Sequence, residues 1–324
     1  MSVLAFLPVS LFLLSLLYLD SFKLVRLRTI VELIVIGCLA AAVSLLINYW
    51  LLRMGVGRYL LTRFDAPAVE ETLKALPILV MLRTRRIGFL IDAAICGFAV
   101  GTGFALTENL YFVSTLAAAP PALWVVRGFG TAVMHGGTTS IMSMITKALL
   151  DRKRSEALWL AAPGLLIAIL LHSLFNHFVL SPAISTVVII LVLPPLMVLV
   201  FSQSERYLRE WLGTGFDLDA ELLKIMQSGE FAQSGAGQYL QSLRDHFDGA
   251  VLADMLCYLR LQSELALRVK GVMMLRESGF PIKKDPEVPE KLTELRYLRQ
   301  NIGKIGELAL APLLRDVWQL HMLE

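Results

Sequence analysis

The chain has 324 residues, of which 56% are hydrophobic and only 18% are charged, and its mean hydropathy is +0.65. This composition excludes an ordinary soluble protein and indicates several membrane spans. The net charge of +3 hides a division, because residues 1–202 hold 15 Lys and Arg against 9 Asp and Glu, whereas residues 203–324 hold 15 against 18. We therefore expect a membrane domain at 1–202 and a separate polar domain at 203–324.

Apolar stretches follow one another along the first domain. A helix needs about 20 residues to cross a bilayer. Seven segments qualify or come close, at approximately 3–19, 30–52, 66–82, 88–116, 123–150, 157–180 and 184–202. The first is expected to be a retained helix, since no basic residue precedes it, and Pro194-Pro195 is expected to bend or break the last. The prediction is an all-α, polytopic transmembrane bundle of about seven spans.

Basic residues in short loops predict the orientation, because such loops stay in the cytoplasm. They cluster in three alternate connections: Lys23, Arg26 and Arg28; Arg83, Arg85 and Arg86; Arg152, Lys153 and Arg154. The N-terminus is therefore expected outside and the C-terminal domain in the cytoplasm. The loop with Arg53, Arg58 and Arg63 disagrees with this topology. With the predicted topology, Glu32 and Asp92 are expected to be ordinary charges near cytoplasmic helix ends.

The polar domain shows helical spacing of apolar residues from Glu205 onward, so it is expected to be all-helical. Breaks are predicted at Gly213 to Gly215, Ser234 to Gly237 and Phe280 to Pro289. No nucleotide-binding glycine motif or basic nucleic-acid patch is found in it, and no nucleic-acid partner is expected.

The third apolar segment places three ionisable side chains within two helical turns. Glu70 and Lys74 are four residues apart, and Glu71 precedes the same lysine by three. The lysine can neutralise one glutamate in an apolar interior. The alternative is an ordinary helix start after Asp65 and Pro67, whose dipole favours acidic residues in the first turn.

The fourth segment combines small residues with an acid. One helix side is nearly bare and allows a close neighbouring helix: Gly97, Gly101 and Gly103. Phe104 and Glu108 follow one turn apart, and Asn109 comes next. The glycine spacing alone most often means only helix packing, whereas a glutamate buried there must find a donor or stay protonated.

Histidines occupy the next two segments. His135 lies among glycines and threonines, and alone it is as often structural as catalytic. His172 and Asn176 are four residues apart and share a helix face, whereas His177 points away. A structural hydrogen-bonded pair is the alternative interpretation of His172 and Asn176.

The depths of these residues agree with one another. Counted at about 1.5 Å per residue from the outer end of each segment, Glu70 lies roughly 6 Å deep, Glu108 and His172 roughly 12 Å, and His135 roughly 18 Å. We therefore expect these groups to meet in one cavity that opens toward the extracytoplasmic side.

Such a set of groups is suited to peptide-bond hydrolysis. A carboxylate beside an imidazole or a second carboxylate can deprotonate a water, and a His with an Asn can donate to the oxyanion on a scissile carbonyl. Serine and aspartyl chemistry are disfavoured, because no Gly-x-Ser-Gly and no Gly-x-Gly-Asp is found; neither is a His-Glu-x-x-His.

Four motifs, in this order, resemble those of the PrsW family of intramembrane proteases: Glu70-Glu71-x-x-Lys74, Phe104-x-x-x-Glu108-Asn109, His135 and His172-x-x-x-Asn176. The resemblance covers about residues 66–180. That family is related to the CAAX-prenyl endopeptidases, whose similar pattern has Arg in place of the lysine and His in place of the second-motif glutamate.

The resemblance implies a role for each residue. Glu70 and Glu71 would activate water together with Glu108, and Lys74 would hold their charge. The carbonyl would be polarised and the oxyanion stabilised by His135, His172 and Asn176, with Phe104 and Asn109 in support.

A second version of the site uses zinc. Glu108, His135 and His172 would form a site of two histidines and one carboxylate with an open position, and Glu70 or Glu71 would be the base. Because the three ligands come from different helices, their spacing does not decide between Zn²⁺ and no cofactor. We favour the metal-free version.

The resemblance also implies the substrates, namely single-span membrane proteins such as anti-sigma factors, cleaved at site 1 near the outer membrane boundary. With the basic interior loops, this fits a bacterial plasma membrane, with membrane lipid as the other partner. The motifs do not extend into residues 203–324.

Two other functions are compatible with parts of the sequence. A proton-coupled transporter also uses Glu and His within helices, but it needs paths to both sides, and no inverted repeat of broken helices is found. A membrane scaffold or receptor would explain the polar domain but not the polar residues in the spans.

Overall fold

The computed structural model describes residues 3–20, 22, 24–116, 119–153, 157–177, 179–278, 280 and 285–314. Every regular element within these residues is a helix, which confirms the all-α class. Lys23 and Arg154 of the basic loops, and residues 281–284 of the last predicted break, lie outside the described residues.

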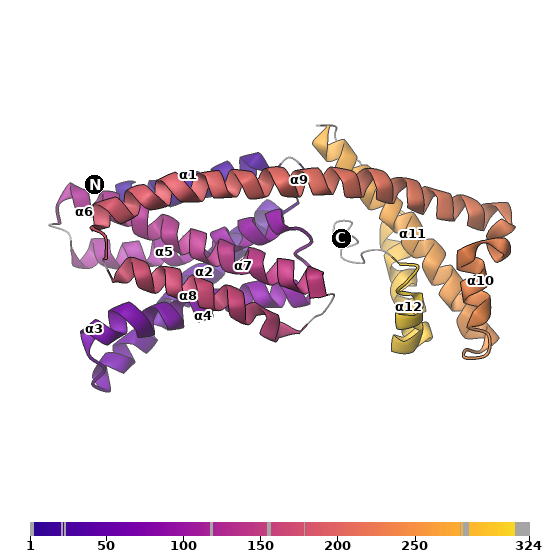
Figure 1. Ribbon diagram of the computed structural model, residues 1–324, viewed down its shortest axis with the longest axis horizontal. Coiled ribbons are helices and arrows are strands. Elements are labelled where there is room, and N and C mark those ends of the chain that lie inside the picture. Colours follow the sequence, from indigo (N-terminus) through magenta and orange to yellow (C-terminus); the bar gives the residue numbers. More distant parts are fainter. Residues whose placement is uncertain are drawn as a thin grey trace. The chain divides into compact units, whose positions relative to one another are not determined.

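The chain divides into two compact units, Met1–Ser204 and Glu205–Glu324. Their helices follow in the order shown in Figure 1. The helices are α1 (Val3–Leu19), α2 (Leu27–Arg53), α3 (Arg58–Leu60), η1 (Leu61–Asp65), α4 (Ala66–Arg83), α5 (Leu90–Thr115), α6 (Pro121–Val125), η2 (Val126–Ala132), α7 (Val133–Lys153), η3 (Leu158–Ala161), α8 (Ala162–Asn176), α9 (Pro182–Ser228), η4 (Glu230–Gln233), α10 (Gly235–Ser242), α11 (Gly249–Glu277) and α12 (Val288–Leu310). The short elements η1 and η2 are π-helical, and η3 and η4 are 3-10 helices.

Four helical stretches in the described part of the chain are long and apolar enough to cross a membrane, which supports a membrane protein. They are α2, α5, the continuous stretch Leu158–Asn176 and α9. The 17-residue α1 is apolar but shorter. Helices also occupy the predicted segments 66–82 and 123–150. A count of seven spans, the outside N-terminus and the cytoplasmic C-terminal domain remain predictions.

The helix α9 runs without interruption from Pro182 to Ser228. The predicted break at Gly213 to Gly215 is therefore wrong, and the pair Pro194-Pro195 does not end the helix. A Cβ at Gly215 would lie 2.7 Å from Lys270 Nζ, which forms an ion pair with Asp219 at 2.5 Å. The glycine lets this lysine approach α9 closely, and it does not serve as a helix stop.

The second unit is built mainly on α11 and α12, which pack along each other. Apolar side chains such as Leu259, Leu265 and Leu295 are buried in it. Gly303 interrupts α12 with a φ of 64°, a left-handed conformation that glycine adopts without steric cost.

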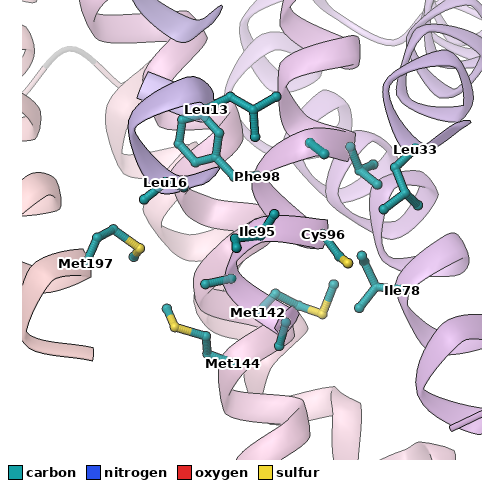
Figure 2. Packing of buried hydrophobic residues seen from close by; sticks show 14 of the residues in the cluster. Leu13, Leu16, Leu33, Ile78, Ile95, Cys96, Phe98, Met142, Met144 and Met197 are labelled. Carbon is teal, nitrogen blue, oxygen red and sulfur yellow. The ribbon is translucent and has the colours of Figure 1, made fainter. Parts of the chain in front are cut away.

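The core of the first unit surrounds α5. Figure 2 shows Ile95 and Phe98 of α5 packed among side chains from α1, α2, α4, α7 and α9, including Leu16, Ile78 and Met142. The rings of Phe12 and Phe98 stack with their centres 4.7 Å apart. Residues Ile91 to Ala105 of α5 are buried almost continuously, so this helix is the centre of the membrane unit.

The glycines of α5 set its distance from two neighbours. A Cβ at Gly101 would lie 2.4 Å from the His135 carbonyl oxygen of α7, and one at Gly103 would lie 1.9 Å from the Ile34 carbonyl oxygen of α2. Both helices therefore touch α5 backbone to backbone, as small residues in membrane helices allow. The contact at Gly101 holds His135 close to α5.

Glu32 and Asp92, both predicted to be ordinary interfacial charges, differ in their burial. Glu32 is half-exposed and pairs with Arg28 at 2.9 Å. Asp92 is instead buried and accepts hydrogen bonds from the backbone N–H groups of Gly88 and Phe89 at 2.9 and 3.0 Å. It caps the start of α5, where free N–H groups need acceptors.

The substitution Gly103→Ala tests the contact between α5 and α2. Alanine normally stabilises a helix by about 1 kcal/mol relative to glycine, but here its methyl group would overlap a backbone carbonyl. We expect a loss of about 1–3 kcal/mol in the free energy of unfolding, measured by denaturation in detergent. Gly57→Ala, at a position with open space, is the control. A Gly103→Ala protein as stable as the wild type would contradict this packing.

Candidate active site

The charged residues at the start of α4 form the centre of the site. This helix begins directly after η1, and Glu70, Glu71 and Lys74 are all buried on it. Lys74 Nζ lies 2.6 Å from Glu71 Oε1, with the two side chains 0% and 1% exposed. The lysine thus contacts one of the two adjacent glutamates, as the spacing predicts.

Three donors from three helices converge on a single oxygen of Glu71. Besides Lys74, His172 Nδ1 of α8 lies 2.8 Å from Oε1, and the Thr138 hydroxyl of α7 donates to it at 3.2 Å. A carboxylate that accepts several hydrogen bonds is stabilised in its charged form. Glu71 therefore joins α4, α7 and α8.

His135 bridges the lysine and the second-motif glutamate. Its Nδ1 lies 3.1 Å from Lys74 Nζ, and its Nε2 lies 3.1 Å from Glu108 Oε2. An ammonium can only donate, so Nδ1 is the acceptor and the ring proton lies on Nε2, where it is donated to Glu108. The Phe104 ring packs on both neighbours, 5.0 Å from the His135 ring and 4.8 Å from Lys74 Nζ.

His172 has the opposite assignment of its nitrogens. Its Nδ1–H donates to Glu71, so its Nε2 carries the lone pair and faces Glu70 Oε2 at 3.8 Å. The two histidine rings are perpendicular, with centres 4.8 Å apart. The structure thus gathers both predicted histidines with all three predicted glutamates.

Glu108 has a cationic partner that the sequence analysis did not single out. Arg127 Nη2 of η2 lies 3.1 Å from Glu108 Oε2, and Arg127 Nε donates to Asn109 Oδ1 at 2.9 Å. Asn109 in turn donates to the Ala5 carbonyl of α1 at 2.6 Å. An arginine in an otherwise apolar segment was the available signal, because such a charge needs an internal partner.

Glu70 is held more loosely than the other two glutamates. Asn48 Nδ2 of α2 lies 3.4 Å from its Oε1, and Ser44 contacts the same amide at 3.3 Å. Asn48 was also not predicted from the sequence. Its spacing of four residues from Ser44 within an apolar helix was a weak signal for an inward polar face.

Asn176 does not join this hydrogen-bonded cluster in the described part of the chain. Its amide donates to the Thr62 carbonyl at 3.0 Å, and Ser173 donates to the Arg63 carbonyl at 2.5 Å. Both acceptors belong to η1, which leads into α4. His177 stacks edge-on against Phe64 of the same turn, with ring centres 4.8 Å apart. The end of α8 thus fixes η1, and Asn176 contributes to that anchor.

The residue types suit a metal ion. One ligand atom from each of Glu70, His135 and His172 lies within 4.8 Å of the others, so Glu70 takes the place that the sequence analysis gave to Glu108. His172 has the arrangement of a zinc ligand, with Nδ1–H anchored on a carboxylate and Nε2 free. His135 does not, since Lys74 at Nδ1 leaves the proton on Nε2. In this arrangement His172 is suited to bind a metal ion, whereas His135 is not.

The site consists of ionisable groups from several helices of the apolar unit, which pair with one another and are largely shielded from solvent. This arrangement is typical of an integral membrane protein with chemistry in its interior. The comparison with protein families agrees. A family model described as PrsW family intramembrane metalloprotease matches residues 25–200, and the chain belongs to this family. Membership supports intramembrane endopeptidase activity. Comparisons with curated proteins and with solved structures find no significant match.

The substitution Lys74→Met tests how far the site depends on its buried cation. It would leave Glu71 charged and buried with its lysine partner removed, so we expect a loss of about 3–5 kcal/mol in the free energy of unfolding. The double variant Glu71→Gln, Lys74→Met removes both charges and should recover a large part of that loss, as measured by unfolding in detergent.

The exposed pair of Arg28 and Glu32 provides the control for these variants. Glu32→Gln should change stability by less than about 1 kcal/mol. If Lys74→Met unfolded no more easily than this control, the ion pair would not carry the stability assigned to it.

Proposed function

We propose that this protein hydrolyses a peptide bond of single-span membrane proteins with a water activated by Glu70. The observation that carries the proposal is the distribution of charge in the cluster. Three carboxylates face two cations: Lys74 pairs with Glu71, and Arg127 pairs with Glu108. Glu70 is the carboxylate without a cationic ion pair among the described residues.

The hydrogen bonds divide the glutamates in the same way. Glu71 Oε1 accepts from three donors, so this oxygen is committed to them and Glu71 supports His172 and Lys74. From the residues that the structure describes, Glu70 accepts one long hydrogen bond, from Asn48 at 3.4 Å. A general base needs an oxygen that is free to take a proton, and Glu70 has one.

The reaction uses Glu70 twice. The water oxygen attacks the carbonyl carbon while its proton passes to Glu70, and the C=O electron pair moves onto oxygen to form an oxyanion. When this pair returns, the C–N bond breaks and the leaving amine takes the proton from Glu70. His172 Nε2, 3.8 Å from Glu70 Oε2, accepts a hydrogen bond from the water and aligns it.

A zinc version remains an alternative within the same function. Glu70, His135 and His172 would hold the ion, which would supply Lewis-acid activation of water and carbonyl. It requires that the proton on His135 Nε2 be lost in spite of the neighbouring Lys74. The contact of 3.1 Å between Lys74 and His135 therefore supports the metal-free version.

Family membership and the basic loops support a proposal for the substrates and the location. We propose anti-sigma-factor-like proteins cleaved at site 1, a bacterial plasma membrane, an outside N-terminus and a cytoplasmic C-terminal domain at 203–324. Exposed apolar residues on α2 and α9, such as Leu46 and Leu191, supply a lipid-facing surface on which a single-span helix can lie.

Cleavage of a single-span substrate by the full-length protein in proteoliposomes tests this proposal. We expect Glu70→Gln to lower kcat by about 10²–10⁴-fold, the usual contribution of a general base. Glu71→Gln and His172→Ala should also lose activity, because they remove the support of the site. Glu32→Gln, at an exposed glutamate, is the control and should cleave at the wild-type rate.

Each variant is measured with and without a chelator. The metal-free mechanism expects no effect of the chelator on the wild type, whereas loss of cleavage that zinc restores would establish the metal version. Glu70→Gln cleaving as fast as the wild type would show that Glu70 is not the base.

A further inference from the structure

Arg127 makes more contacts than an ion pair requires. Its Nη2 lies 3.1 Å from Glu108 Oε2, its Nε donates to Asn109, and its guanidinium carbon lies 3.7 Å from the centre of the Phe112 ring. The side chain is only 11% exposed. Apart from its pairing with Glu108, none of the roles described above uses this residue.

The Nη2 group of Arg127 has unused donors. It is buried and lies within ion-pair distance of Glu108, yet within the described residues it makes no hydrogen bond of regular geometry. A buried donor without an acceptor is costly to a protein. Beside Glu108, in the cluster that also holds the proposed base Glu70, such a donor indicates a ligand with an acceptor oxygen.

The other donors of the site are already committed. His135 Nε2–H donates to Glu108, His172 Nδ1–H to Glu71, and the Asn176 amide to the Thr62 carbonyl. Lys74 donates to Glu71 and His135 and is fully buried. The groups expected from sequence to stabilise an oxyanion thus each have a protein acceptor, whereas Arg127 Nη2 makes no hydrogen bond among the described residues.

The segment that carries Arg127 is held firmly. A Cβ at Gly128 would lie 1.9 Å from the Leu4 carbonyl oxygen of α1, and one at Gly130 would lie 2.3 Å from Thr186 Oγ1 of α9. The backbone of η2 therefore packs directly on both helices. Donors that are fixed before the reaction stabilise developing charge most effectively.

We propose that Arg127 is a catalytic residue whose Nη2 donates to the carbonyl oxygen of the scissile bond and to the oxyanion formed from it. Nε, bound to Asn109, and the Phe112 ring fix the plane of the guanidinium group that carries Nη2. This role rests on the proposed peptide hydrolysis. It is distinct from simple neutralisation of Glu108, for which any cation would suffice.

Full-length Arg127→Ala and Arg127→Lys proteins, assayed with the single-span substrate in proteoliposomes, test this role. We expect Arg127→Ala to lower kcat by about 10²–10³-fold, as for the loss of an oxyanion donor, with KM changed by less than about threefold. Arg127→Lys keeps the charge but lacks the planar fork, so its kcat should fall by at least about tenfold. Added guanidinium chloride at millimolar concentration should restore part of the kcat of Arg127→Ala.

Arg53→Ala is the matched control, because Arg53 stacks on Tyr49 away from the cluster and is exposed. It should cleave like the wild type and show no response to guanidinium. Arg127→Lys with wild-type kcat would overturn the role, as would Arg127→Ala with a raised KM and unchanged kcat. If Glu70→Gln is inactive in the same assay while Arg127→Lys is fully active, peptide hydrolysis stands and only Arg127 is misassigned. A wild type that does not cleave would overturn both.

Discussion

The buried contact between Lys74 and Glu71 is the interaction on which the rest of the site depends. A charge in an apolar interior is stable only with a partner, and here the two side chains lie 2.6 Å apart out of reach of solvent. The lysine also contacts His135 of α7, and the glutamate contacts His172 of α8. One ion pair on α4 therefore fixes the orientation of both imidazoles and the protonated nitrogen of each.

Helix packing supplies the second constraint. The backbone of α5 touches α7 at Gly101 and α2 at Gly103, so the distances between these helices are set by atoms that cannot move aside. Glu108 lies about two turns further along α5 than Gly101, and His135 is itself the residue contacted at Gly101. The close approach of α7 to α5 brings the two helices near enough for His135 Nε2 to lie 3.1 Å from Glu108 Oε2.

The sequence predicted what lies within one helix better than what lies between helices. The spacing of Glu70, Glu71 and Lys74 was sufficient to predict the buried contact, and the helices at 66–82 and 88–116 followed from hydropathy. Arg127 and Asn48 were missed because their importance depends on which neighbour their helix faces. Asn176 shares a face with His172, but the π-helical turn η1 presents a carbonyl to it, which the spacing does not reveal.

Burial separates the residues proposed to react from those proposed to orient them. Lys74, Glu71, His135 and His172 are at most 3% exposed, whereas Glu70 and Arg127 are 11% exposed and Glu108 is 21% exposed. A peptide bond must reach a base and an oxyanion donor, but it need not touch the groups that hold them. Among the described residues, the less buried group includes a carboxylate without a cationic ion pair, Glu70, and a guanidinium with an unused donor, Arg127; these are the groups proposed to act on the water and the oxyanion. The deeper residues contact one another across α4, α7 and α8, and the central ion pair of Lys74 and Glu71 is shielded from water.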